Sequence, residues 1–150
     1  MVLELTPDLL DAIYNHATCT YPNECCGLLV GVCQSDQRQV MAVKPMQNAW
    51  SAEVAAEMQI NYSQGTRDRY WLDPAQMLEV MREARSQSQE IVGVYHSHPD
   101  HVATPSECDR QLAWQNYSYL ILAVGQGKVV DHQSWVLDDN HRFQSEAILI

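Results

Sequence analysis

The segment from Ile91 to Asp109 constrains the fold of this chain more than any other part of the sequence. It begins with Ile91-Val-Gly-Val-Tyr95, a continuously apolar run typical of a strand that is covered on both faces. His-Ser-His-Pro follows directly, and Pro99 is expected to end the strand pairing and turn the chain. Because residues two apart on a strand point to the same side, His96 and His98 are predicted to aim both imidazoles at one point.

A helix is predicted to begin a few residues beyond this turn. Thr104-Pro105-Ser106-Glu107 fits a capping box, with Thr104 at the N-cap, Pro105 at N1 and Glu107 at N3. In the helix that follows, Ser106 and Asp109 are three residues apart and therefore share a face. The order of strand, turn and capped helix thus predicts that two imidazoles and a carboxylate meet.

Other start signals and apolar runs supply the rest of the fold. Thr6-Pro7 and Asp73-Pro74 each open a helical pattern, the second with Gln76 at N3. Strands are expected at 26–33, 39–43, 117–124, 129–137 and 143–150, with a hairpin at 125–128. The stretch from 47 to 70 reads as a loop, with one further strand near 58–62. The chain is predicted to be a mixed α/β protein with a central sheet flanked by about three helices.

Length and charge limit the number of domains and the kinds of binding partner that this chain can have. A chain of 150 residues suits one domain spanning 1–150, because two separate cores would each be too small. The net charge is −10, and nine Lys and Arg stand scattered among nineteen acids without a basic run, so nucleic acid and anionic membrane surfaces are not expected as partners. No stretch approaches the roughly 20 apolar residues that span a bilayer. The acidic N-terminus predicts no signal peptide, so a cytoplasmic location is the default expectation.

The five cysteines do not form a recognisable framework. An odd count in a chain without a signal peptide favours reduced thiols. No Cys-x-x-Cys pair occurs, which removes the thiolate zinc-finger and zinc deaminase interpretations. Cys25 and Cys26 are adjacent and would point to opposite faces of a strand, which is a poor arrangement for holding one ion.

The side chains around His96 predict a zinc site. Two neutral imidazoles and the Asp109 carboxylate are a three-ligand set that suits zinc and leaves a fourth position for a catalytic water. Zinc lowers the pKa of bound water from 15.7 to about 7, which creates a nucleophile at neutral pH. One Zn²⁺ per chain is therefore expected, held by His96, His98 and Asp109.

Two further residues are candidates for catalysis. Glu24 stands just before the apolar strand at 26–33, where partial burial should raise its pKa, as suits a general base that later acts as an acid. Ser106 could donate a hydrogen bond to an oxyanion, although a serine near a helix start is also common for local hydrogen bonding.

This pattern resembles the JAMM motif of MPN+ metallopeptidases: a Glu before a strand, then His-Ser-His-Pro, then Ser-x-x-Asp. The resemblance implies that His96, His98 and Asp109 bind zinc, that Glu24 is the acid/base and that Ser106 stabilises the oxyanion. It also implies an MPN/JAB-type fold, similar to cytidine deaminase, in which the sheet is partly barrel-like. Glu24-Cys-Cys-Gly-Leu-Leu and the helix start at Asp73-Pro74 are similar to the small prokaryotic branch of the family.

The family resemblance implies a substrate class and leaves alternatives. Family members hydrolyse peptide or isopeptide bonds after the C-terminal Gly-Gly of ubiquitin-like proteins, and one activity of the prokaryotic branch releases cysteine from a ubiquitin-like sulfur-carrier protein. A peptidoglycan or other peptide amidase and a non-catalytic MPN scaffold are the two rivals. The sequence leaves open whether the chain forms a homodimer, and whether His101, Cys108 or Trp50 touches the substrate.

Overall fold

A computed structural model of the protein describes residues 1–59 and 65–150. Within them, four helices accompany a seven-stranded sheet that closes into a barrel. The strands are β1 (Val2–Glu4), β2 (Cys26–Gln34), β3 (Gln37–Met46), β4 (Glu90–Pro99), β5 (Ser118–Gly125), β6 (Lys128–Leu137) and β7 (Phe143–Leu149). The helices are α1 (Pro7–Thr20), α2 (Ala52–Glu57), α3 (Pro74–Ser86) and α4 (Glu107–Leu112). The predicted mixed α/β fold with a partly barrel-like sheet is confirmed.

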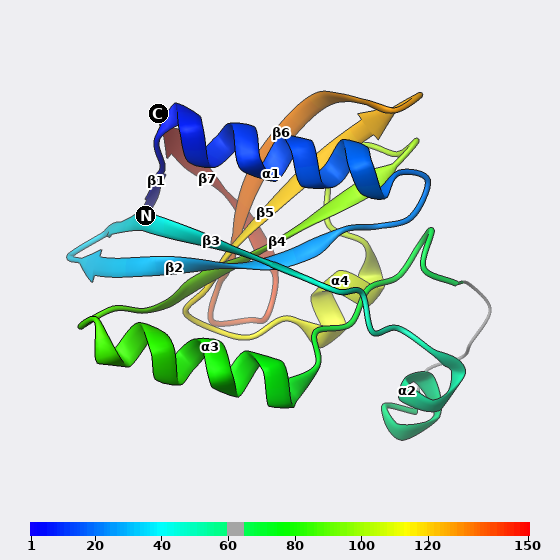
Figure 1. The fold of residues 1–150 in the computed structure, drawn as a ribbon, viewed down its shortest axis with the longest axis horizontal. Helices are drawn as coiled ribbons and strands as arrows, with labels where there is room; N and C mark the ends of the chain where they lie inside the picture. Colours follow the sequence, from blue (N-terminus) through cyan, green and yellow to red (C-terminus); the bar gives the residue numbers. More distant parts are fainter. Residues whose placement is uncertain (60–64) are drawn as a thin grey trace.

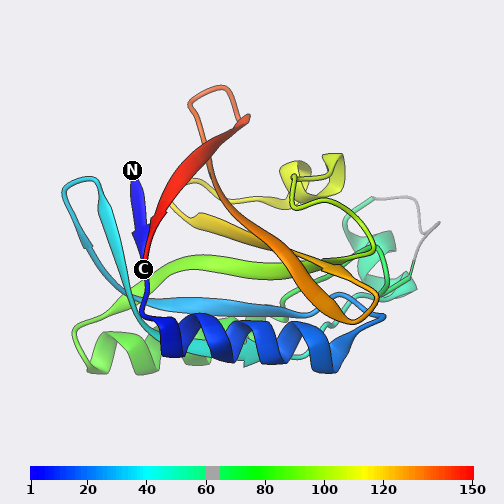
Figure 2. The same cartoon turned by 90° about the horizontal axis from the view of Figure 1, so that it is seen from above.

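The barrel follows the order β1-β3-β2-β4-β5-β6-β7. Three neighbouring pairs are parallel, namely β1 with β3, β1 with β7 and β4 with β5, and the other pairs are antiparallel. The first and last strands lie side by side and close the barrel (Figure 2). The parallel β4–β5 pair requires a crossover, and this connection carries α4.

Two apolar cores lie on the two faces of β2 and β4. Leu10, Ile13 and Ala17 of α1 pack on one face, together with Leu29 and Tyr95. On the other face, Met77 and Ala84 of α3 pack with Leu28 and Val94. The two helices therefore cover different parts of the sheet (Figure 1). This double cover explains why β2 and β4 read as unbroken apolar runs.

Two of the three predicted helix starts are confirmed, and the third is displaced. Thr6 caps α1 by accepting from Leu9 N, and Asp73 caps α3 by accepting from Ala75 N. The prediction that Thr104 caps the third helix is wrong. The N-cap of α4 is Ser106, whose hydroxyl accepts from Asp109 N at 3.0 Å while the Asp109 carboxylate accepts from Ser106 N at 2.9 Å.

The reason for this displacement is that two overlapping pairs fit the same pattern. Thr104 with Glu107 and Ser106 with Asp109 both place a hydroxyl three residues before an acid. The second pair is the one used, and its carboxylate also contacts two imidazoles at the end of β4. Tertiary contacts thus select the later helix start.

Two elements have no counterpart in the sequence predictions. Helix α2 is capped by Ser51, which accepts from Val54 N, and the short strand β1 pairs with both β3 and β7. The predicted strand near 58–62 falls largely on residues 60–64, which lie outside the described residues. No helix in the described chain is both long and apolar enough to cross a membrane.

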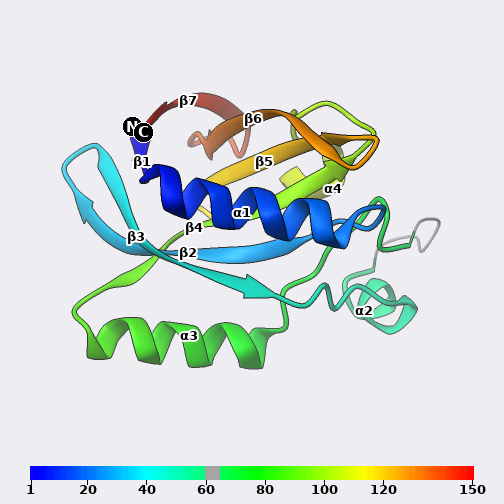
Figure 3. The same ribbon diagram turned by 45° about the horizontal axis from the view of Figure 1, so that its top comes forward.

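The end of β4, the start of β2, α2 and α4 lie toward the same end of the molecule (Figure 3). Cys25, just before β2, and Cys26, its first residue, lie in opposite apolar cores, as predicted, and all five cysteines are free. The chemistry-bearing residues of the sequence are therefore concentrated at one end of the barrel.

Candidate metal centre

The side chains of the last residues of β4 alternate between the two faces of the sheet. Tyr95 and Ser97 are fully buried toward the α1 side, where the Tyr95 hydroxyl is hydrogen bonded to His16 Nδ1 at 2.7 Å. His96 and His98 lie on the opposite face, with their Nε2 atoms 3.1 Å apart. The alternation predicted from the His-x-His spacing is therefore present.

Asp109 completes a compact group of three donor atoms. Its Oδ2 lies 3.2 Å from His96 Nε2 and 3.0 Å from His98 Nε2. Ligands held 2.0–2.1 Å from a tetrahedral zinc ion are about 3.4 Å apart, so the three edges of this triangle are close to the size that such an ion needs.

The tautomer of His98 gives an independent test of the fit. Its Nδ1 donates to the carbonyl oxygen of Val102 at 2.8 Å, which leaves the lone pair of the neutral ring on Nε2. That lone pair faces the Asp109 carboxylate at 3.0 Å, an arrangement that needs a proton or a cation between the two acceptors. The donor set therefore fits a divalent metal, and the Val102 carbonyl orients one ligand for it.

Electrostatics keep Asp109 ionised. Burial alone would raise its pKa, but the charges and hydrogen bonds of His96 and His98 outweigh burial and hold the pKa well below its usual range. Burial lowers the pKa of His96, while the contacts of His98 with Asp109 outweigh burial and raise the pKa of that ring. The centre therefore offers a cation the ionised carboxylate of Asp109 and the neutral imidazole of His96.

Glu24 lies beside this group in a different electrostatic state. One of its carboxylate oxygens and the His96 and His98 ring nitrogens all lie within 4.8 Å of one another. The side chain is 3% exposed, and Oε1 has no hydrogen-bond partner among the described residues. Burial first, and then the charge of Asp109, raise the pKa of Glu24 well above its usual range. The environment therefore favours a carboxyl group that can hold a proton.

Ser106 is placed by its capping role. Its hydroxyl oxygen accepts a hydrogen bond from Asp109 N, and its half-buried side chain lines the cleft that contains Glu24 and His98. Because the oxygen is occupied as an acceptor, the hydroxyl proton remains available to donate. The local capping interpretation and the catalytic interpretation of this serine are thus compatible.

The cleft at this centre has a volume of ≈ 280 Å³, close to the lower end of the range for ligand pockets. Its lining residues are Glu24, Asp68, Arg69, His98, His101, Val102, Thr104 and Ser106. His101 projects at its rim with a mostly exposed side chain, 3.8 Å from Asp68. Trp50 and Cys108 are buried and do not line the cleft. Of the three residues left open by the sequence, His101 alone is placed to meet a ligand.

Two residues that the sequence did not indicate hold the Glu24 segment in place. Ser97, between the two histidines, accepts from Cys25 N at 2.8 Å, and its own N–H donates to the Cys25 carbonyl at 3.1 Å. Asn48 donates to the Glu24 carbonyl at 3.2 Å and to the Arg69 carbonyl at 2.9 Å. The serine of the His-Ser-His motif was a readable signal for the first, whereas nothing in the sequence marks Asn48.

The Asn48 amide is fully used. Its oxygen accepts from Trp50 N at 3.0 Å and from Trp71 N at 3.2 Å, in addition to the two bonds that its nitrogen donates. One side chain thus ties together the chain before α2, the chain before α3 and the segment that carries Glu24.

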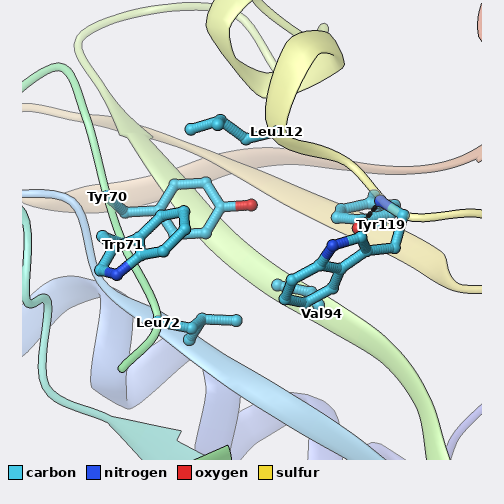
Figure 4. Close-up of a pocket in the computed structure, with 7 residues that line it drawn as sticks. Tyr70, Trp71, Leu72, Val94, Leu112 and Tyr119 are labelled. Carbon is cyan, nitrogen blue, oxygen red and sulfur yellow. Dashed lines mark hydrogen bonds between the residues drawn. The ribbon is translucent and has the colours of Figure 1, made fainter. Parts of the chain in front are cut away.

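Aromatic and aliphatic side chains lie around His96, and one of them, Tyr70, contacts its ring. The ring of Tyr70 stacks on the His96 imidazole, with centroids 4.3 Å apart and planes inclined by 22°. Tyr70, Trp71 and Leu72 face Val94 and Tyr119 across a cavity of ≈ 20 Å³, which has room for about one water molecule (Figure 4). The stacking fixes the plane of the His96 ring, whose Nδ1 has no hydrogen-bond partner in the described structure.

The chain is similar to known proteins over most of its length. The model of the prokaryotic homologs of the JAB domain matches residues 6–138. A Haloferax volcanii protein named Desampylase is 35% identical over 142 residues, which cover 91% of this chain and 90% of that protein. A Mycobacterium tuberculosis protein named CysO-cysteine peptidase is 31% identical over 121 residues, covering 81% of this chain and 72% of that protein. The solution structure of a Desulfitobacterium hafniense protein has a TM-score of 0.78 at 28% identity, covering 99% of this chain and 92% of that one.

Proposed function

Because this chain belongs to the family of prokaryotic homologs of the JAB domain, we propose that it is a hydrolase acting on conjugates of a ubiquitin-like sulfur-carrier protein. In this proposal it is a zinc metallopeptidase that cleaves the peptide or isopeptide bond after a C-terminal Gly-Gly. Relatives named Desampylase and CysO-cysteine peptidase support the substrate class. The observation that carries the proposal is the triangle of His96, His98 and Asp109 donor atoms beside an unpartnered buried Glu24.

Asp109 suits the third ligand position better than Glu24 does. Both carboxylates lie close to the two imidazoles, but Asp109 contacts both at hydrogen-bond distance and its pKa is held low. Glu24 has a raised pKa and lacks a hydrogen-bond partner for Oε1 among the described residues. Zinc held by His96, His98 and Asp109 would supply Lewis-acid polarisation and a water of lowered pKa.

Glu24 then carries the proton of the reaction. Its carboxylate accepts a proton from the attacking water and delivers it to the nitrogen of the leaving group. A raised pKa makes the carboxylate a stronger base, and a group whose pKa lies nearer the working pH can both take up and release the proton. Asn48 and Ser97 both hold the peptide unit that follows Glu24, through the Glu24 carbonyl and Cys25 N, and so restrict where the carboxylate can lie.

Ser106 is assigned to the developing oxyanion. The hydroxyl keeps a free proton while its oxygen caps α4, so the helix start also orients the donor. A small cleft favours an extended Gly-Gly tail, because glycine lets the substrate backbone approach the walls closely.

Cleavage of defined conjugates tests this function. Ubiquitin-like sulfur-carrier proteins would be prepared with one residue or a lysine-linked peptide after Gly-Gly, and the products identified by mass spectrometry. We expect zinc-dependent release of the extension and restoration of the Gly-Gly terminus. Glu24→Ala should lower kcat by about 10²-fold or more while metal content stays unchanged.

The two rival functions predict different results. A non-catalytic scaffold would bind zinc and leave every Gly-Gly conjugate intact, and a peptidoglycan amidase would release peptides from cell-wall fragments instead. Hydrolysis that survives both chelation and the Glu24→Ala substitution would contradict the proposed mechanism.

A further inference from the structure

Arg69 is the single arginine or lysine among the described residues that line the cleft of the metal centre. The chain carries a net charge of −10, and the same cleft contains the acids Glu24 and Asp68. Within the described structure, no carboxylate forms an ion pair with the Arg69 guanidinium, whose NH1 donates instead to the Asp68 carbonyl at 2.8 Å. The other donors of this guanidinium remain available to an anionic ligand.

The backbone fixes Arg69 relative to Glu24. The Asn48 amide nitrogen donates to the carbonyl oxygens of both residues, at 3.2 Å for Glu24 and 2.9 Å for Arg69. Burial raises the pKa of both the Glu24 carboxyl and the Cys108 thiol, and the positive charge of Arg69 acts against burial at both groups. The two residues are therefore tied together through one amide, and both line the same cleft.

The leaving group must lie beside the Glu24 carboxyl. Under the proposed function, Glu24 gives its proton to the nitrogen of the leaving group, so that nitrogen lies next to the carboxyl. When the leaving group is a single amino acid, its α-carboxylate carbon is about 2.5 Å from the same nitrogen, as the N–Cα and Cα–C bond lengths require. A lysine-linked leaving group carries no carboxylate at that distance from its scissile nitrogen.

We propose that Arg69 binds the free α-carboxylate of a one-residue leaving group and so selects conjugates in which a single amino acid follows Gly-Gly. This inference rests on the proposed function and adds a specificity-determining residue to it. Arginine suits the task because its planar fork binds a carboxylate through two parallel hydrogen bonds. The surrounding acids disfavour a carboxylate that lacks such a partner.

Two conjugates that differ in one group test this role. A carrier protein ending in Gly-Gly-Ala with a free carboxylate would be compared with the same protein ending in Gly-Gly-Ala-amide. We expect the wild type to prefer the free acid in kcat/KM by roughly 10–100-fold, as one charged hydrogen-bonded pair supports. Arg69→Gln should abolish this preference, and Arg69→Lys should retain part of it.

Arg67→Gln is the matched control, because Arg67 is an exposed arginine two positions away that does not line the cleft. It should leave the acid-to-amide ratio unchanged. If Arg69 acts only by tuning Glu24, Arg69→Gln slows both conjugates equally and the ratio stays at its wild-type value, which overturns the inference. A wild-type ratio near one also overturns it while leaving the proposed function intact. Failure of the wild type to cleave either conjugate overturns the inference, and it overturns the proposed function as well if a lysine-linked peptide after Gly-Gly is also left intact.

Discussion

At the scale of single residues, the site depends on two buried carboxyl groups with opposite proton affinities. Asp109 accepts hydrogen bonds within a cluster of two imidazoles and an N–H group, and its pKa is held low. Glu24 is just as buried, but Oε1 has no partner in the described structure and its pKa is raised. Both positions carry a carboxyl group, so the surroundings decide which one stays ionised and which one can hold a proton.

The raised pKa of Glu24 should make stability depend on pH. Between the ordinary pKa of about 4.3 and the raised folded value, the folded chain keeps a proton that the unfolded chain has lost, so stability falls as pH rises through that window. Metal-free Glu24→Gln should therefore have a higher melting temperature than the metal-free wild type, by a margin that grows as pH rises above the ordinary pKa of a glutamate.

Glu79→Gln is the control, because Glu79 is exposed on α3. It should change the melting temperature equally at every pH. A margin for Glu24→Gln that stays constant or shrinks as pH rises would show that the carboxyl is not destabilised by burial.

Ser106 has two roles that two substitutions can separate. Ser106→Ala should cost about 1 kcal/mol of stability by removing the cap of α4, and should lower kcat by about 10²–10³-fold by removing the oxyanion donor. Ser106→Gly should lower kcat by the same factor but cost only a few tenths of a kcal/mol, because glycine is a tolerated N-cap. Recovery of kcat in the glycine variant would assign the whole effect to capping.

At the scale of elements, the site depends on how β2 and β4 are joined. Ser97 on β4 binds both backbone polar groups of Cys25, just before β2, and Glu24 immediately precedes it. A Cβ on Gly27 would lie 2.3 Å from the Tyr95 ring, so the two strands can pair here only because this position is glycine. The strand pair thus positions Glu24 next to His96 and His98.

Asn48 is the corresponding tie between loops. Asn48→Ala removes four hydrogen bonds, two of them to carbonyls of residues in the cleft, and should lower stability by roughly 2–4 kcal/mol and kcat/KM by about tenfold or more. Asn48→Asp keeps the acceptor for Trp50 N and Trp71 N but loses both donors. If Asn48→Asp matches the wild type in kcat/KM, the donors to Glu24 and Arg69 do not position the site.

Helices and strands could be predicted from the sequence wherever interactions between residues close in the chain determine them. The caps at Thr6 and Asp73 and the double-faced apolar strands were predicted correctly, because side-chain chemistry a few residues apart fixes them. The start of α4 was misplaced by two residues, because Thr104 and Ser106 satisfy the same local rule and only contacts with β4 choose between them. Helix α2 is too short to show an apolar period.

At the scale of the whole molecule, the barrel carries the candidate metal centre at one end, away from most of its apolar packing. Both apolar cores lie along the barrel and its covering helices, and Arg38 of β3 pairs with Glu146 of β7 in a buried ion pair at 3.3 Å. Removal of a bound metal should therefore leave the fold intact. It should lower the free energy of unfolding only by the amount that metal binding contributed.

Chelation and readdition of zinc test this separation. Far-UV circular dichroism should be unchanged after chelation, and zinc at 100 times its Kd should stabilise the protein by about 2.7 kcal/mol, seen as a rise in melting temperature. His96→Ala should abolish that rise, and His101→Ala, which changes an exposed histidine of the same cleft, should preserve it. Loss of the circular dichroism signal on chelation would mean that the metal is structural.

The sequence by itself determined the chemical groups and their local geometry. The His-x-His spacing on a strand, the hydroxyl–acid pairs at a helix start and a Glu before an apolar run each follow from backbone periodicity, which a few residues define. The tertiary structure alone decided that Ser106 and not Thr104 caps α4, that Glu24 is left without a hydrogen-bond partner at Oε1 in the described chain, and that Asn48 joins Glu24 to Arg69. These contacts link segments far apart in the chain, and their energies depend on burial, which appears only when the barrel closes.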